Sequence, residues 1–366
     1  MSGQLPLYIQ QKLAEQRKNH AFRRLHLPET GSIDFTSNDY LGLSRVGLTS
    51  DNAGYSHGSG GSRLLSGNFV AAEVLEKTIA AFHQAPTALL FNSGYDANLG
   101  LLSAVAKEGD SIFYDILSHA SLRDGIKLSK AEAFPFLHND IEDLGRRLAK
   151  ARGSIYVVTE SLFSMDGDLA PLAEMVGICE AAGAYLIVDE AHATGVIGPG
   201  GHGLVQELHL QDRIFARVHT FGKAVGCHGA AVLGSQDLKD FLINFSRPLI
   251  YTTSLPPASV AAIAKAYNRF PAMDAEREQL TRLIAHMQSV DIPQRKLISH
   301  SPIQGVIVPG NEEVTVMANR LQLAGMDCRP IRYPTVPKQK ERIRIILHAF
   351  NTIGEIEQLA ASLRGT

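Results

Sequence analysis

Residues 154–190 read SIYVVTESLFSMDGDLAPLAEMVGICEAAGAYLIVDE, and this stretch determines how the fold is interpreted. Two short apolar runs, 154–161 and 185–190, flank a helical pattern at 171–183. Strands that are apolar on both sides are typical of a sheet buried between two layers of helices. The stretch therefore predicts two parallel strands joined by a helix.

The same alternation extends in both directions and predicts an α/β fold with a mainly parallel sheet between helices. Beyond about Leu255, a long helical stretch leads into a smaller α+β unit. Residues 5–25 form an amphipathic helical pattern, and residues 33–43 form a short strand-like pattern. The predicted helices are 73–83, 95–107 and 118–129, and the further strands are 88–93, 111–115, 131–136, 216–221 and 230–235. The predicted organisation is a helical arm at 1–45, a large domain at 46–255 and a small domain at 256–366.

Composition excludes several classes of function. Thirty-five basic and 37 acidic side chains give a formal charge of -2, so no overall field favours nucleic acid or an anionic membrane as partner. Three distant cysteines, Cys179, Cys227 and Cys328, form no paired framework, and no apolar run approaches the ~20 residues of a spanning helix. These features predict a cytoplasmic protein that binds small polar ligands.

Three motifs with other meanings lack the context that they require. Residues 189–192 spell DEAH, as in helicases, but no GxxxxGK[ST] phosphate loop accompanies them. The GPGGHG stretch at 198–203 satisfies GxGxxG but starts well past a strand end. Asp189, His192 and His119 lack a further carboxylate or cysteine at ligand spacing, so no metal site is predicted.

Unusual polar residues follow five of the predicted strands. In open α/β sheets the ligand binds beyond the carboxyl ends of the strands, so these residues indicate one shared site. They are 92–95, Asp115 with His119, Glu160 with Ser161 and Ser164, 189–192, and 220–223.

Lys223 is the most informative of these residues. It lies in 219–234, HTFGKAVGCHGAAVLG, where glycines allow a tight turn between two strands. Burying an unpaired cation costs several kcal/mol, so a lysine among small residues usually reaches water or loses its charge. A lysine on such a turn is able to form an imine with an aldehyde cofactor.

Pyridoxal phosphate (PLP) is an aldehyde cofactor whose needs match the neighbouring residues. Its ring nitrogen needs a carboxylate, for which Asp189 is suited, and His192 would reach the phenolic oxygen. Its phosphate needs N–H groups at a helix start together with hydroxyls, which 93–95 and Thr220 would supply. His119 would supply a flat ring for stacking.

The chain resembles the α-oxoamine synthases, PLP enzymes of aminotransferase fold type I, from about residue 38 to residue 352. The motifs that carry the resemblance, in order, are SNDYLGL, GSGGSRLLSGN, FNSGYDANLG, HASLRDG, TESLFSMDGD, VDEAHATG, TFGKAVGCHGA, YTTSLPP and RIRIILHAFNT. It departs from the family before the glycine-rich loop, where Tyr55 is followed by Ser56 and the preceding segment is short.

The resemblance implies roles for the catalytic residues. Lys223 matches the Schiff-base lysine and Asp189 the partner of the pyridine nitrogen. His192 matches a contact of the ring oxygen, with Ser164 beside it, and His119 matches the imidazole that stacks on the ring.

The resemblance also implies binding residues. Ser93, Gly94 and Tyr95 match the phosphate-binding turn, with Thr220 from the same chain and Thr252 from the second subunit of a homodimer whose active site lies at the subunit interface.

Arg344 matches the group that holds the substrate carboxylate, and Asn38 and Arg23 are assigned to substrate binding with it. Glu160 is assigned to the cofactor site as a support for His119. The structural alternatives are an exposed arginine on a strand for Arg344, turn or cap residues for Asn38 and Ser164, and a simple strand end for Glu160.

Within the family, the stretches PTVPKQKERIRIILHAF and LINFSRPLIYTTSLPP favour the member that condenses L-alanine with a pimeloyl thioester in biotin biosynthesis. The acyl group would be carried on coenzyme A or on a carrier protein. The alternatives are glycine C-acetyltransferase or another α-oxoamine synthase, and, from a different class, a PLP-binding protein without turnover.

Overall fold

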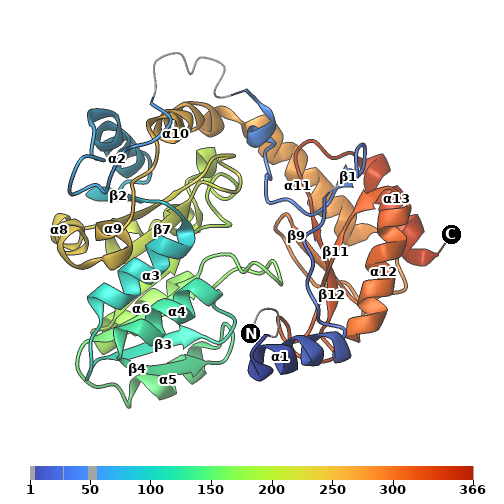
Figure 1. The fold of residues 1–366 in the computed structure, drawn as a ribbon, viewed down its shortest axis with the longest axis horizontal. Coiled ribbons are helices and arrows are strands. Elements are labelled where there is room, and N and C mark those ends of the chain that lie inside the picture. Colours follow the sequence, from blue (N-terminus) through green and yellow to red (C-terminus); the bar gives the residue numbers. More distant parts are fainter. Residues whose placement is uncertain (1–4, 28, 48–55, 366) are drawn as a thin grey trace. The chain divides into compact units, whose positions relative to one another are not determined.

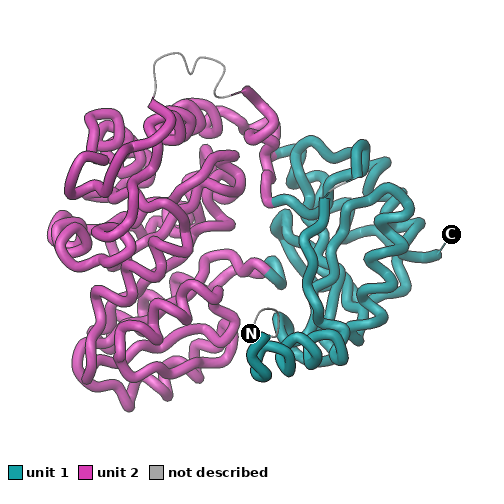
Figure 2. Tube along the Cα trace, in the orientation of Figure 1, with its two compact units in different colours: residues 1–37, 165–167, 278–366 teal, residues 38–164, 168–277 magenta. Residues whose placement is uncertain are grey.

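The computed structural model describes residues 5–27, 29–47 and 56–365, so Tyr55 lies outside the described residues. The chain divides into two compact units, which Figure 2 colours separately. Unit 1 comprises residues 1–37, 165–167 and 278–366, and unit 2 comprises residues 38–164 and 168–277. In this division the amino-terminal residues belong to the same unit as the carboxy-terminal ones, whereas the sequence analysis predicts a separate amino-terminal arm.

Unit 2 is built on a seven-stranded sheet (Figure 1). The strand order is β2-β8-β7-β6-β5-β3-β4, and only β8 runs antiparallel to its neighbours. The predicted mainly parallel sheet is therefore confirmed. The strands are β2 (Thr87–Phe91), β3 (Ser111–Asp115), β4 (Glu132–Phe136), β5 (Ile155–Glu160), β6 (Tyr185–Asp189), β7 (Ala216–Thr220) and β8 (Ala230–Gly234).

Helices cover both faces of this sheet. On one face, alternate strand residues such as Val158, Ile187 and Val218 pack with α3, α4, α8 and α9 in one buried cluster. On the other face, α2, α5 and α6 pack against the remaining strand residues. The helices of unit 2 are α2 (Val70–Phe82), α3 (Gly94–Val105), α4 (Ala120–Ser129), α5 (Ile141–Leu148), α6 (Leu172–Ala182), α7 (Leu204–Glu207), α8 (Gln236–Phe245), α9 (Arg247–Ile250) and α10 (Pro257–Arg269).

Local signals define where the helices near the strand ends begin. Ser93 caps α3 by accepting a hydrogen bond from Asp96 N, and the His119 side chain caps α4 through Ser121 N. α3 therefore starts just after the carboxyl end of β2, and α4 starts after the short loop 116–119 that follows β3. Their first turns lie at the edge of the sheet where a ligand is expected.

Unit 1 is an α+β unit, as expected for the small carboxy-terminal part. Its three-stranded antiparallel sheet has the order β11-β12-β9, and a two-stranded parallel sheet pairs β1 with β10. Its strands are β1 (Ile33–Asp34), β9 (Ile303–Ile307), β10 (Met326–Asp327), β11 (Arg329–Ile331) and β12 (Arg342–Ile346), and its helices are α1 (Leu7–Lys18), α12 (Asn311–Leu323) and α13 (Ile353–Arg364), with α11 (Asp274–Ser289) starting in unit 2.

One local expectation needs correction. The stretch 33–43 forms a strand only at Ile33–Asp34, and residues 38–42 are loop, because the side chains of Asp34 and Asp39 bind nearby backbone N–H groups. α1 forms within the predicted amino-terminal helical stretch, and it buries none of its residues. Among the described residues, no helix is long and apolar enough to span a membrane.

Candidate active site

The site in unit 2 lies at the carboxyl ends of the parallel strands. Glu160 and Asp189 are register partners on β5 and β6, and both side chains are buried. Thr220, the last residue of β7, is the register partner of Ala230 on β8. Ala230 is also the register partner of Phe91, the last residue of β2. The structure therefore places these strand ends along one edge, as the sequence predicted.

A chain of hydrogen bonds joins Asp189 to His119. The side-chain amide of Asn98, on α3, donates to Asp189 Oδ2 over 2.7 Å and to Ser121 Oγ over 3.0 Å. Ser121 Oγ lies 2.8 Å from His119 Nδ1. Since Ser121 N also donates to Nδ1 over 3.2 Å, this nitrogen is an acceptor and the proton of a neutral ring lies on Nε2.

The charge states of this network follow from its surroundings. Desolvation lowers the pKa of His119 below its ordinary value, although the Asp189 carboxylate opposes the shift and part of the residue is exposed. Burial, reinforced by Asp189, raises the pKa of Glu160 to about 8, while a hydrogen bond from His119 N to Glu160 Oε1 at 2.7 Å opposes it. The site thus contains a neutral imidazole and a carboxyl group that holds its proton near pH 7, and Glu160 holds the backbone of His119.

Lys223 lies on the turn between β7 and β8, with its Nζ 3.3 Å from Thr220 Oγ1. The same threonine packs closely on the start of α3, because a Cβ atom at Gly94 would lie only 2.5 Å from Thr220 Cγ2. The predicted imine-forming lysine therefore shares a neighbour with the predicted phosphate-binding turn.

The helix start offers donors for an anion. The first N–H groups of α3 have no partner within the helix, and the helix dipole favours negative charge there. Ser93 supplies a hydroxyl at the cap, and the Tyr95 hydroxyl donates to Asp124. Thr252 of the same chain accepts a hydrogen bond from Asn92 Nδ2 over 3.2 Å, one residue before this cap. That Thr252 binds the cofactor phosphate of the second subunit in a homodimer stays a prediction.

His192 is buried after β6, and its Nδ1 lies 2.6 Å from the hydroxyl of Tyr40. Tyr40 OH also lies 3.3 Å from Asn38 Oδ1, which brings the predicted residue Asn38 next to the His192 pair. Ser164 lies in the loop after β5, in the segment between the bridged residues Leu162 and Leu169.

Arg344 and Arg23 belong to unit 1. Arg344 lies on β12 directly across from Arg329 of β11, so the two side chains leave the same face of the sheet. Arg23 donates to Thr335 Oγ1 over 3.2 Å.

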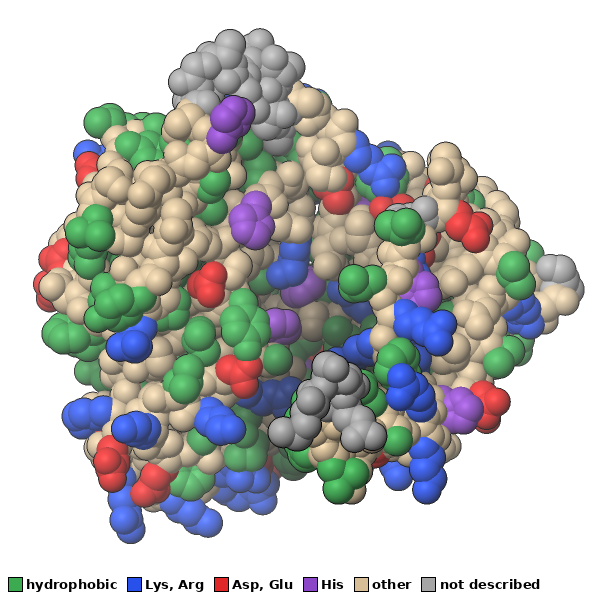
Figure 3. Space-filling model, in the orientation of Figure 1, with side chains coloured by type: hydrophobic (Ala, Val, Ile, Leu, Met, Phe, Trp, Pro, Cys, Tyr) green, Lys and Arg blue, Asp and Glu red, His purple; other side chains and the backbone are tan. Residues whose placement is uncertain are grey.

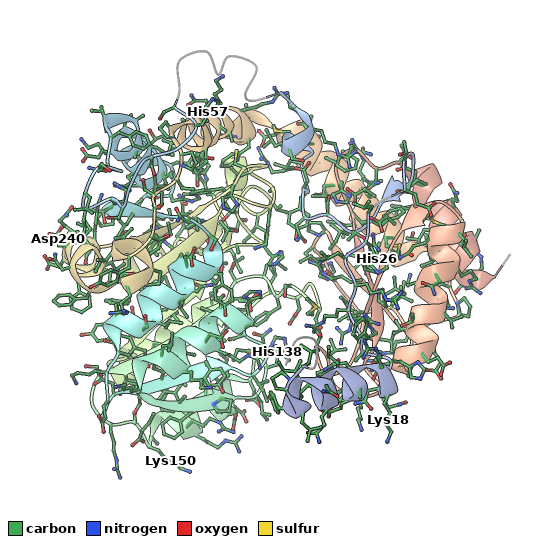
Figure 4. The ribbon with its side chains drawn as sticks, in the orientation of Figure 1. Lys18, His26, His57, His138, Lys150 and Asp240 are labelled. Carbon is green, nitrogen blue, oxygen red and sulfur yellow. The ribbon has the colours of Figure 1, made fainter. Side chains whose placement is uncertain are left out.

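Arg23 and Thr335 line a pocket of about 440 Å³ within unit 1. Its lining also includes Arg24, His26, Arg329 and Arg332. Figure 4 labels His26, and Figure 3 shows Lys and Arg side chains on this part of unit 1. Arg329 is paired with Asp327 at 2.8 Å, and the remaining basic side chains favour an anionic ligand over a cationic one.

Sequence reasoning missed Asn98, Ser121 and Tyr40 as parts of the site. Each lies within a motif that was noted for its neighbours: FNSGYDANLG, HASLRDG and SNDYLGL. A polar residue on the otherwise apolar face of α3 was a usable signal for Asn98, since a buried amide needs partners. Arg63, in the GSGGSRLLSGN motif, pairs with the buried Glu76 at 2.7 Å, which is a structural role.

The donor set of unit 2 fits PLP. A buried carboxylate with one Asn98 hydrogen bond suits the pyridine nitrogen, the α3 start with its hydroxyls suits a phosphate, and Lys223 supplies the amine. The close packing at Gly94 leaves no room for a side chain where the backbone N–H groups must approach a phosphate.

Comparisons with known proteins identify the family of the chain. The family model for aminotransferase class I and II matches residues 30–363. The 8-amino-7-oxononanoate synthase of Emericella nidulans is 42% identical, with 93% of this chain and 90% of that protein covered. A putative 8-amino-7-oxononanoate synthase of Haemophilus influenzae is also 42% identical, with 90% of each covered.

Solved structures give the same result. A serine palmitoyltransferase variant from S. paucimobilis with a bound PLP–myriocin aldimine has a TM-score of 0.89 and 27% identity, covering 98% of this chain and 96% of that one. The 8-amino-7-oxononanoate synthase of Francisella tularensis has a TM-score of 0.80 and 29% identity, covering 92% of this chain and 98% of that one.

Proposed function

Because the chain belongs to the aminotransferase class I and II family, we propose that it is a PLP-dependent 8-amino-7-oxononanoate synthase. It condenses L-alanine with a pimeloyl thioester, releasing carbon dioxide and the free thiol carrier, in a step of biotin biosynthesis. The curated relatives with this name, at about 40% identity, support the reaction. Lys223, Asp189 and the start of α3 support the cofactor.

When bound, PLP would withdraw electrons from the α-carbon of the amino acid. Asp189 would hold a proton at the ring nitrogen, and Asn98 keeps the Asp189 carboxylate in place. Lys223 Nζ would take the proton from the α-carbon of alanine. The neutral ring of His119 would stack on the cofactor, and Arg344 would bind the carboxylate of the amino acid.

The basic pocket of unit 1 supports a pimeloyl thioester as the acyl donor. A pimeloyl chain ends in a carboxylate, whereas acetyl and palmitoyl chains carry no charge. Arg23, Arg332 and their neighbours suit a charged chain end, since an arginine binds a carboxylate in bidentate geometry. This disfavours glycine C-acetyltransferase as the function.

The direct test offers the PLP-loaded protein L-alanine, glycine or L-serine with pimeloyl-, acetyl- or palmitoyl-coenzyme A, and identifies products by mass. We expect 8-amino-7-oxononanoate from L-alanine and pimeloyl-coenzyme A. Faster turnover of glycine with acetyl-coenzyme A would overturn the assignment. A protein that binds PLP but turns over no amino acid would establish the non-catalytic alternative.

Two variants test the named residues. Lys223→Ala should abolish turnover and the borohydride-trapped covalent attachment of PLP, while Lys265→Ala, at an exposed position on α10, should keep both. Arg332→Gln should raise KM for pimeloyl-coenzyme A about tenfold and leave KM for L-alanine unchanged, corresponding to a loss of about 1.4 kcal/mol. Arg282→Gln, at an exposed position on α11, is its control.

A second copy of the chain is the partner that we propose for an apolar surface of unit 2. Val70 and Val74 on α2 and Phe245 on α8 are 78%, 54% and 60% exposed. Figure 3 shows hydrophobic side chains over these helices. Phe245→Glu should shift the molar mass measured by light scattering from dimer to monomer, and an unchanged mass would exclude this surface.

We place the enzyme in the cytoplasm. The three cysteines are unpaired, which agrees with a reducing compartment. Fluorescence microscopy of a tagged full-length chain in its own host would test this, and accumulation at a membrane would contradict it.

A further inference from the structure

Tyr40 is held next to His192 by contacts that do not involve His192. In its loop, the carboxylate of Asp39 accepts hydrogen bonds from Ser44 N at 3.2 Å and Ser44 Oγ at 2.6 Å. A Cβ atom at Gly226 would lie 2.5 Å from Ser44 N, so the loop packs tightly against the turn that follows Lys223. The Tyr40 side chain has no exposed surface. Its position is therefore determined by the fold.

The distances around the Tyr40 hydroxyl define the direction of its proton. The hydroxyl has one proton, and it can donate this proton to His192 Nδ1 at 2.6 Å or to Asn38 Oδ1 at 3.3 Å. The shorter contact is the stronger one, so the hydroxyl donates to Nδ1. A neutral imidazole that accepts at Nδ1 carries its proton at Nε2.

We propose that Tyr40 is a positioning residue that keeps His192 in the Nε2–H tautomer, so that this imidazole can donate a hydrogen bond to an oxygen of the bound cofactor. This inference rests on the proposed function for the identity of the ligand. An oxygen that carries negative charge gains from a donor and is repelled by the lone pair of the other tautomer. Tyr40 thus acts through His192.

Tyr40→Phe is the natural test because it removes only the hydroxyl. Tyr267→Phe is a matched control: Tyr267 is also buried, and its hydroxyl lies 3.0 Å from His83 Nε2 in the same unit. Both variants lose a buried tyrosine–histidine hydrogen bond, so a purely structural role predicts the same consequences for both. Their difference isolates the effect on His192.

The first readout needs neither cofactor nor turnover. Nitrogen-15 NMR of histidine-labelled protein without PLP, with the His192 signal assigned by a His192→Gln variant, should show the Nε2–H tautomer in the wild type. Tyr40→Phe should convert it to a mixture of tautomers, and Tyr267→Phe should leave it unchanged. An Nδ1–H tautomer in the wild type would overturn the inference.

The second readout uses bound PLP. Tyr40→Phe should shift the pH midpoint of the cofactor absorbance by at least about 0.5 units and weaken PLP binding about fivefold, corresponding to the loss of one hydrogen bond of about 1 kcal/mol. Tyr267→Phe should change neither. If both variants lose only stability, the proposal is wrong. Failure to make 8-amino-7-oxononanoate would overturn the proposed function alone, since these readouts do not depend on the reaction.

Discussion

Replacing His138 by glutamine should destabilise unit 2 in a way that depends on pH. His138 follows β4 and is labelled in Figure 4. Its Nδ1 lies 3.0 Å from both carboxylate oxygens of Asp115, and its Nε2 lies 2.7 Å from Asp168 Oδ2. Since both nitrogens face carboxylates, both carry protons and the ring is a cation. The variant leaves two carboxylates without this cation.

The magnitude follows from the pKa. Burial opposes the charge, but hydrogen bonds to Asp115 and Asp168 outweigh it and raise the pKa of His138 from 6.5 to about 10. At about 1.4 kcal/mol per pH unit, this shift is equivalent to at most about 5 kcal/mol. The side chain is 23% exposed, so solvent screening reduces the value, and we expect about 2–3 kcal/mol.

The sign of the pH dependence is defined. A histidine whose pKa rises on folding contributes its full stability below pH 6.5 and loses it as the pH rises towards 10. The difference in unfolding free energy between wild type and His138→Gln should therefore be largest at pH 6 and shrink towards pH 10.

Urea unfolding of the protein without PLP measures this difference. The chain has no tryptophan, so circular dichroism is the suitable signal. His286→Gln removes an exposed pair with Glu357 and should cost less than about 1 kcal/mol. A gap between wild type and His138→Gln that is equal at pH 6 and pH 10 would refute the reasoning.

Three further predictions concern unit 2. Gly94→Ala places a Cβ atom 2.5 Å from a side-chain carbon of β7 and should weaken PLP binding at least about tenfold in an absorbance titration. The control Gly177→Ala, whose Cβ atom would have nothing within 4 Å, should not weaken it. Glu76→Ala removes a carboxylate that is 2% exposed and paired with two cations, so the free energy of unfolding in urea should fall by about 3–5 kcal/mol. The exposed control Glu73→Ala should lower it by about 0.5 kcal/mol or less. Burial raises the pKa of Glu190 to about 7, so wild-type stability should fall relative to Glu190→Gln between about pH 4.5 and pH 7, and a constant difference would contradict this.

Much of the fold was predictable because its signals are local. The strands of 154–190 and their neighbours were identifiable from short apolar runs, and the start of α3 from Ser93 followed by a helical pattern. The loop at 38–42 was harder to predict, because its apolar residues resemble a strand. There the side chain of Asp39 binds nearby backbone and hydroxyl groups and competes with strand pairing.

The residue types of the candidate site were predictable from the sequence, but the contacts between them were not. The sequence alone determined that polar residues follow several parallel strands, because the order of strands and helices defines which strand ends share an edge. It also identified Lys223 as a lysine on a tight turn among small residues, which needs a chemical reason.

Only the tertiary structure decided which residues hold these groups in place. Asn98 and Asp189 are 91 positions apart, and Tyr40 and His192 are 152 apart, yet each pair is joined by a hydrogen bond shorter than 2.8 Å. Helix and strand periodicities relate residues only a few positions apart, so they contain no information about such pairs. The physical reason for these contacts is the packing of the 38–44 loop and α3 around the sheet, where an unpaired buried polar group costs free energy and most such groups therefore find a partner.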